Sequence, residues 1–136
     1  MGRNITKIIL FTFDFFSMLG ETFSHHEVFA MMTVTAWKNG TPSPSGAGYG
    51  VRLAAEDRDR YFQRDWETIE LEFAGYANVV KVDIANESFW NSSCRELIHS
   101  EIGRWLIDNG LDSWPMWQPP KLSLRFIGGN RFRLTK

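Results

Sequence analysis

The sequence predicts an α+β fold: a mainly antiparallel sheet of about five strands packed against one long helix, plus a short helix. Three observations predict it. Several segments alternate apolar and polar residues, one segment has the apolar spacing of a helix, and the long strand–helix alternation of parallel sheets is absent. Aromatic residues make up 15% of the 136 residues, which is enough for a packed core.

Composition divides the chain into an arm, a loop and a globular part. Residues 1–36 are an N-terminal arm, either an accessory segment or an extended translation start, because globular patterning begins near Met31 and Met32. Residues 37–47 are rich in Pro, Ser and Gly and form a surface loop. Residues 48–136 are expected to form a single α+β domain.

The arm also bears on localisation. Its apolar run is interrupted by Asp14 and lacks a small-residue cleavage site, which disfavours a signal peptide. The run is also shorter than the roughly 20 residues that a membrane span needs. We therefore expect no membrane span and a cytoplasmic location.

The first half of the globular part holds three strands and the short helix. Residues 49–53 are expected to form a strand and residues 54–62 one or two helical turns. In residues 66–73, Ile, Leu and Phe alternate with Thr and Glu, which is typical of a strand with one wet face. Residues 79–84 alternate again and should pair with it as an antiparallel hairpin.

The long helix is expected over residues 93–110. Ser93 and Glu96 have the spacing of a capping box, and Gly110 suits a left-handed C-terminal cap. Gly103 inside the helix costs about 1 kcal/mol against Ala, which predicts close approach by another element. The apolar stripe at helical spacing consists of Leu97, Ile98, Ile102, Trp105 and Leu106.

The C-terminal segment is expected to form a second hairpin. Three prolines in residues 114–120 exclude regular structure there. Residues 121–127 and 131–135 both alternate and are joined by Gly-Gly-Asn, which favours a tight turn.

Several chemistries find no support in the sequence, so no catalytic, cofactor-binding or metal-binding residue is assigned. A single cysteine, Cys94, excludes an internal disulfide and a multi-cysteine zinc site. The alternating Gly46, Gly48 and Gly50 do not match the dinucleotide fingerprint. We expect them instead to let a strand begin where the backbone is crowded.

The C-terminal hairpin is one candidate binding surface. Its polar face gathers cationic side chains, and the formal net charge of the whole chain is −1. Such a face can follow a phosphate backbone, or it can pair with Glu70 and Glu72 on a neighbouring strand. The cationic residues are Lys121, Arg125, Arg131 and Arg133.

Two further groups complete the candidate surface. Arg58 and Arg64 lie in a run of mixed charges and suit either an anion-binding fork or a solvated, salt-bridged turn. Trp114 and Trp117 suit either exposed recognition, with Met116, or a lid that packs on the helix.

Four segments of the chain are distinctive: SGAGYGVRL, EDRDRYF, SFWN-x-x-CREL and NGL-x-x-WP. With them the chain resembles a family of small uncharacterised bacterial proteins carried on integron gene cassettes and plasmids. The resemblance spans about residues 45–136. It implies a mobile-element origin but no established activity, cofactor or catalytic residue.

These observations favour a small non-catalytic binding or protein-interaction module, expected to form a homodimer or to bind another protein. One alternative is a nucleic-acid-associated protein that uses the basic hairpin. A second is a small-ligand-binding protein or enzyme with an unfamiliar site, built around residues such as Arg58, His99 or Glu101.

Overall fold

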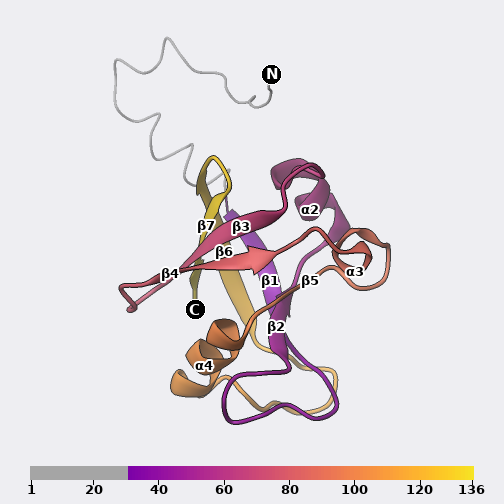
Figure 1. Cartoon of the computed structure of the whole chain (residues 1–136). Coiled ribbons are helices and arrows are strands. Elements are labelled where there is room, and N and C mark those ends of the chain that lie inside the picture. The colour runs from indigo at the N-terminus through magenta and orange to yellow at the C-terminus, as the bar shows by residue number, and fades with distance from the viewer. Residues whose placement is uncertain (1–30) are drawn as a thin grey trace. The chain divides into compact units, whose positions relative to one another are not determined.

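The computed structural model describes residues 31–136, and it divides the chain into the units Met1–Met31 and Met32–Lys136 (Figure 1). Ten elements follow one another in the described part. They are β1 (Met31–Lys38), β2 (Tyr49–Arg52), α2 (Ala55–Tyr61), β3 (Thr68–Phe73), β4 (Val79–Asp83), α3 (Glu87–Trp90), β5 (Glu96–Ile98), α4 (Ser100–Asp108), β6 (Lys121–Gly128) and β7 (Arg131–Thr135).

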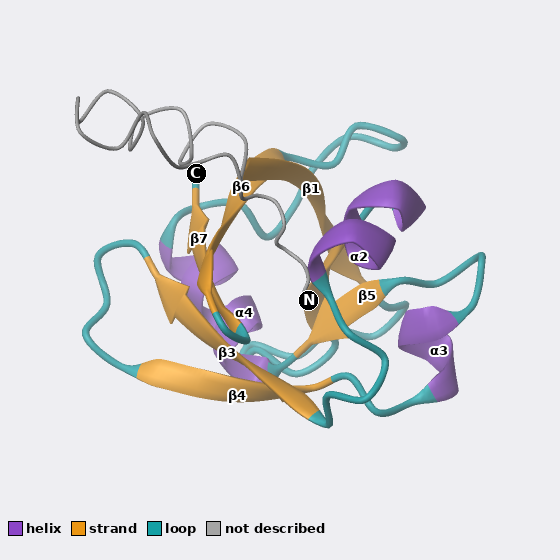
Figure 2. Ribbon diagram, turned by 90° about the horizontal axis from the view of Figure 1, so that it is seen from above, coloured by secondary structure: helices purple, strands orange, loops and turns teal. Residues whose placement is uncertain are grey.

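The strands form one seven-stranded sheet in the order β4-β3-β7-β6-β1-β2-β5. Its two end strands, β4 and β5, also lie beside each other, so the sheet curls into a nearly closed barrel (Figure 2). The predicted five-stranded sheet packed on one long helix is therefore wrong. Curling lets the sheet bury its apolar face against itself, so no long helix is needed to cover it.

Alternation along the strands fills the barrel. In β3, Ile69, Leu71 and Phe73 are at most 1% exposed, whereas the Thr and Glu between them face outward. The predicted hairpins β3–β4 and β6–β7 are both present and antiparallel. Between them, β3 and β7 pair in parallel, with Leu71 opposite Phe132.

Strand β1 belongs to the sheet, although the sequence places residues 31–36 in the arm. Met32, Val34 and Ala36 are buried and alternate with outward-facing Thr residues. β1 lies between β6 and β2, so it is an inner strand of the barrel. The other predictions for the arm concern residues 1–30 and lie outside the described residues.

The predicted long helix is also absent. Residues 96–98 form β5, which pairs with β2, and only Ser100–Asp108 are helical. Arg95 has a positive φ of 66° and His99 is extended, so neither residue has a helical backbone and no helix runs through residues 95–99. Leu97 is fully buried opposite Val51, and this burial within the sheet replaces the helical stripe predicted for it.

Both ends of α4 have local explanations. The Nδ1 atom of His99 accepts a hydrogen bond from the Glu101 amide at 3.0 Å, so His99 replaces the predicted Ser93–Glu96 capping box. At the other end Gly110 has a φ of 70°, as predicted. Its amide donates to Ile107 and the Leu111 amide donates to Leu106, which is a Schellman motif.

Gly103 allows the loop that contains Gly46 to touch the backbone of α4. A Cβ atom at Gly103 would lie 2.6 Å from the Gly46 Cα and would overlap the Gly46 carbonyl oxygen. Likewise, a Cβ atom at Gly50 would overlap the Leu97 carbonyl oxygen. The predicted close approach at Gly103 and the crowding role of the glycines are thus confirmed.

Gly103→Ala should therefore destabilise the fold by about 2–3 kcal/mol, because backbone atoms must move to admit the methyl group. Urea unfolding followed by circular dichroism measures this loss. Gly40→Ala is the matched control, since nothing lies within 4 Å of a Cβ atom there. Equal stability of the two variants would contradict the close contact.

Candidate functional site

Paired charges occupy the polar face of the basic hairpin. The Arg131 Nη2 atom lies 2.6 Å from Glu70 Oε1, and Arg133 Nη1 lies 3.2 Å from Glu72 Oε1. The hydrogen bond from Arg131 to Glu70 raises the pKa of the guanidinium. The predicted pairing with Glu70 and Glu72 is thus present, and it neutralises half of the cationic face.

The other two cations of this face lie on β6. Arg125 is directly opposite Arg133, and Lys121 begins the strand at the far end from the hairpin turn. No ion pair joins Lys121 or Arg125 to another residue of the 31–136 range. Two unneutralised cations, four residues apart on one strand, are a small footprint compared with the phosphate contacts of nucleic-acid binders.

Arg58 has a structural role. It is only 7% exposed, and its Nη1 atom donates to the carbonyls of Phe89 at 3.0 Å and Asn91 at 2.7 Å. Its Nε atom donates to Asp59. The side chain therefore joins α2 to α3, and these donors are directed at the protein's own acceptors.

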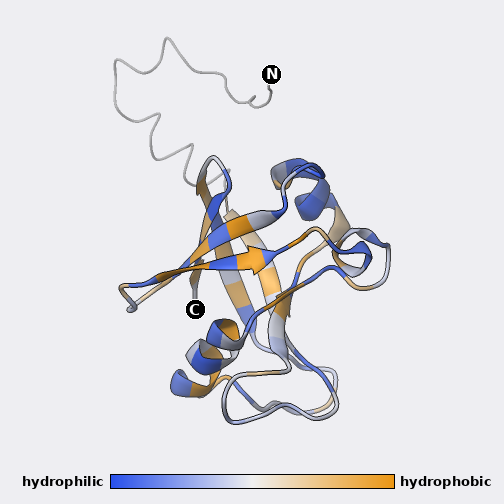
Figure 3. Ribbon diagram, in the orientation of Figure 1, coloured by the Kyte–Doolittle hydropathy of each residue, from blue (hydrophilic) through white to orange (hydrophobic). Residues whose placement is uncertain are grey.

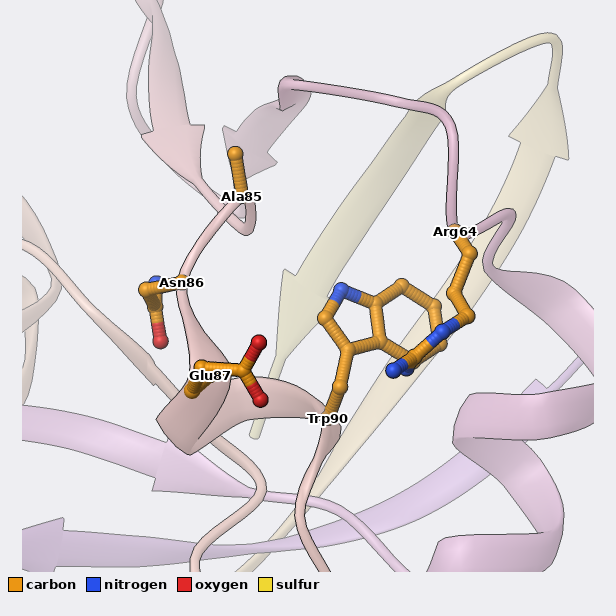
Figure 4. A pocket seen from close by; sticks show the side chains of 5 residues that line it. All are labelled: Arg64, Ala85, Asn86, Glu87 and Trp90. Carbon is orange, nitrogen blue, oxygen red and sulfur yellow. The ribbon is translucent and has the colours of Figure 1, made fainter.

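Arg64 lies at the surface over the indole of Trp90, with its guanidinium carbon 5.0 Å from the ring centroid. Beside them is a shallow hollow of about 190 Å³, lined by Arg64, Ala85, Asn86, Glu87 and Trp90 (Figure 4). Two of its polar groups support the fold: Asn86 accepts from the Phe89 amide to cap α3, and the Trp90 Nε1 atom donates to the Ile84 carbonyl. The hollow thus offers one cation and one carboxylate beside an indole, without a nucleophile.

The two tryptophans of the proline-rich loop have opposite environments. Trp114 is half-buried against the core, with the Lys38 Nζ atom 4.4 Å from its ring centroid. The same ammonium donates to the Asp112 carbonyl at 3.0 Å. By contrast, Trp117 is 89% exposed and Met116 is 76% exposed.

Residues 115–118 form a tight turn, hereafter the Trp117 turn. The Gln118 amide donates to the Pro115 carbonyl at 3.0 Å, and Trp117, the third residue, has a φ of 67°. This is the position of a type II turn that normally holds Gly or Asn. A bulky side chain with positive φ is unusual and strained, so a large aromatic residue is held in solvent at an energetic cost.

The remaining candidates do not converge on a reactive centre. His99 is the helix cap described above, and Cys94 is half-buried near the Asn91 side chain, which accepts from its amide. Within residues 31–136, no three His, Cys, Asp or Glu side chains come close enough to bind a metal ion. His25, His26 and Glu27 are neighbours in the sequence of the arm and are a possible metal-binding group, but they lie outside the described residues. None of the helices in the described part has the length and apolar content needed to cross a bilayer.

Comparison with known proteins identifies no relative: no family model, no curated protein and no solved structure matches this chain.

The buried role of Arg58 predicts a large loss on substitution. Arg58→Met keeps the apolar stem but leaves the Phe89 and Asn91 carbonyls without their donor, so the free energy of unfolding should fall by about 2–4 kcal/mol. Arg60→Met, on the exposed side of the same helix, should change it by less than about 0.5 kcal/mol. If both variants unfold at the same urea concentration, Arg58 does not connect α2 and α3.

Substitution of Trp117 should not destabilise the fold as substitution of Arg58 does, because the Trp117 turn is strained. Trp117→Gly should leave stability unchanged or raise it by up to about 1 kcal/mol, because relief of roughly 1–2 kcal/mol of left-handed strain exceeds the added entropy cost of Gly. The control, Trp114→Gly, should lose about 3 kcal/mol through lost packing. Thermal and urea unfolding compare the two. Similar destabilisation by both substitutions would show that Trp117 supports the fold.

Proposed function

We propose that residues 31–136 form a non-catalytic binding module that contacts its partner through the Trp117 turn. The observation on which this depends is an 89% exposed Trp held at positive φ, beside a 76% exposed Met. Trp and Met are enriched at recognition surfaces, and a few such anchors supply most of the binding energy.

The turn is also pre-organised. Pro115, Pro119 and Pro120 limit the backbone on both sides, the Ala36 amide donates to the Pro120 carbonyl, and the Lys38 ammonium holds Trp114 in place. A rigid element loses less conformational entropy on binding. This rigidity supports a role in recognition.

The alternatives have weaker support. Arg131 and Arg133 of the basic hairpin are paired with carboxylates, which reduces the charge available to nucleic acid. An unfamiliar enzyme would need reactive side chains gathered in a pocket, and the hollow beside Trp90 has neither depth nor a nucleophile. The mobile-cassette origin, the cytoplasmic location and the homodimer remain predictions.

Photocrosslinking in the native cells tests the proposed function. Trp117→benzoylphenylalanine should give a specific adduct, whose mass identifies a protein, a second copy of the chain or a lipid. The same amino acid at exposed Gln63 is the control and should give none. Absence of any adduct at position 117, or identical products at both positions, would refute the Trp117 turn as a contact surface.

A further inference from the structure

The Trp117 turn lies at an uncharged end of the barrel. Two loops meet there, residues 39–48 and residues 113–120, and neither contains Asp, Glu, Lys or Arg. Contacts from Lys38 to Asp112 and Trp114 bring the chain of the second loop beside the start of the first. Figure 3 shows this end in the pale colours of intermediate hydropathy, while charged residues cover much of the helices and of the opposite hairpin.

The exposed apolar area of the turn is too small for a stable protein interface by itself. A buried aromatic side chain contributes about 150–250 Å², so Trp117 and Met116 together offer roughly 300–400 Å². A stable protein–protein interface buries about 800 Å² on each partner. A bilayer does not require a complementary surface of this size, because lipids rearrange around an inserted side chain, and Trp is favoured at the membrane–water interface.

The charges that border this end suit an anionic surface. Lys38 and Lys121 flank the two loops, and Lys121 is exposed at the start of β6, three residues beyond the turn. Arg104 on α4 lies against Gly46 of the first loop. The acidic residues nearest to the turn in sequence both precede Trp114: Asp112 is half-buried, and Asp108 accepts a hydrogen bond from the Tyr76 hydroxyl. Asp108 and Glu101 lie near Arg104 on α4, so Lys121 is the cation of this end that the inference uses.

We propose that the partner of this module is the surface of a bilayer containing anionic lipids. The Trp117 and Met116 side chains enter the interfacial region, and Lys121 contacts the headgroups. This inference rests on the proposed function and specifies its partner. Neither part suffices alone, because lasting attachment to membranes generally takes two signals, here an apolar insertion and a cationic contact.

Flotation of the full chain with vesicles tests the proposal. The chain should bind vesicles of phosphatidylcholine mixed with phosphatidylserine, more weakly at high salt. Trp117→Gly should lower the partition coefficient roughly tenfold or more. Ile127→Ser is the matched control: it removes a 38% exposed apolar side chain at the other end of β6 and should bind as the unmodified chain does.

Two further measurements separate the contribution of the Lys121 charge from that of Trp117 insertion. Lys121→Gln should weaken binding to the mixed vesicles and leave binding to pure phosphatidylcholine unchanged. Brominated lipids should quench the fluorescence of the unmodified chain more than that of Trp117→Gly, since Trp117 is one of six tryptophans. Every variant keeps residues 1–30, so any contribution of that segment cancels in the comparison.

The outcomes distinguish this inference from the proposed function. Equal vesicle binding by the unmodified chain and Trp117→Gly, or no binding by either, overturns the lipid surface as partner. If position 117 nonetheless forms a protein adduct in cells, the binding module stands and its partner is a protein. If neither experiment depends on position 117, both proposals fall.

Discussion

The contact between the backbones of Gly46 and Gly103 is the constraint on which much of the architecture depends. It places the loop of residues 39–48 directly on α4, and that loop leads into β2, which pairs with both β1 and β5. From the same helix, the Nε1 atom of Trp105 donates to the carbonyl of Ala74 at 3.0 Å, beyond the end of β3. α4 therefore connects the two halves of the curled sheet, and any side chain at Gly103 would push it away from the loop.

The fold itself uses most of the polar side chains that the sequence alone suggests as catalytic or binding residues. Arg58 donates to two backbone carbonyls, His99 caps α4, Asn86 caps α3, and Arg131 pairs with Glu70. Each satisfies a donor or acceptor that would otherwise remain unpaired at a helix end, at a loop or on the outer face of the sheet. These four side chains of the described residues are therefore already engaged by the fold.

Local patterns predicted single elements well and their assembly poorly. Alternation in β3, β4, β6 and β7 was sufficient to place these strands and the polar faces that pair Arg131 with Glu70. The joining of the two hairpins into one sheet depends on the parallel pairing of β3 with β7, which are about 60 residues apart and share no local pattern. Leu97 and Ile98 fit both a helix and a strand, and only pairing with β2 decides between them.

For the candidate site, Trp114 and Trp117 look alike in sequence. Their environments differ because the Lys38 ammonium covers Trp114, while the φ of 67° at Trp117 belongs to a turn that leaves its side chain in solvent.

The two ends of β6 differ in how charge and backbone strain are distributed around them. Near the hairpin, neighbouring strands place opposite charges side by side, and Arg131 and Arg133 pair with Glu70 and Glu72. At the other end Lys121 precedes the strand's apolar residues, and in the loop before it a Trp occupies a backbone position that Gly would fill without strain. Core packing gives no reason for this choice, because Trp117 is 89% exposed. An exposed aromatic residue at a strained backbone position supports the proposed role of the Trp117 turn as a contact surface.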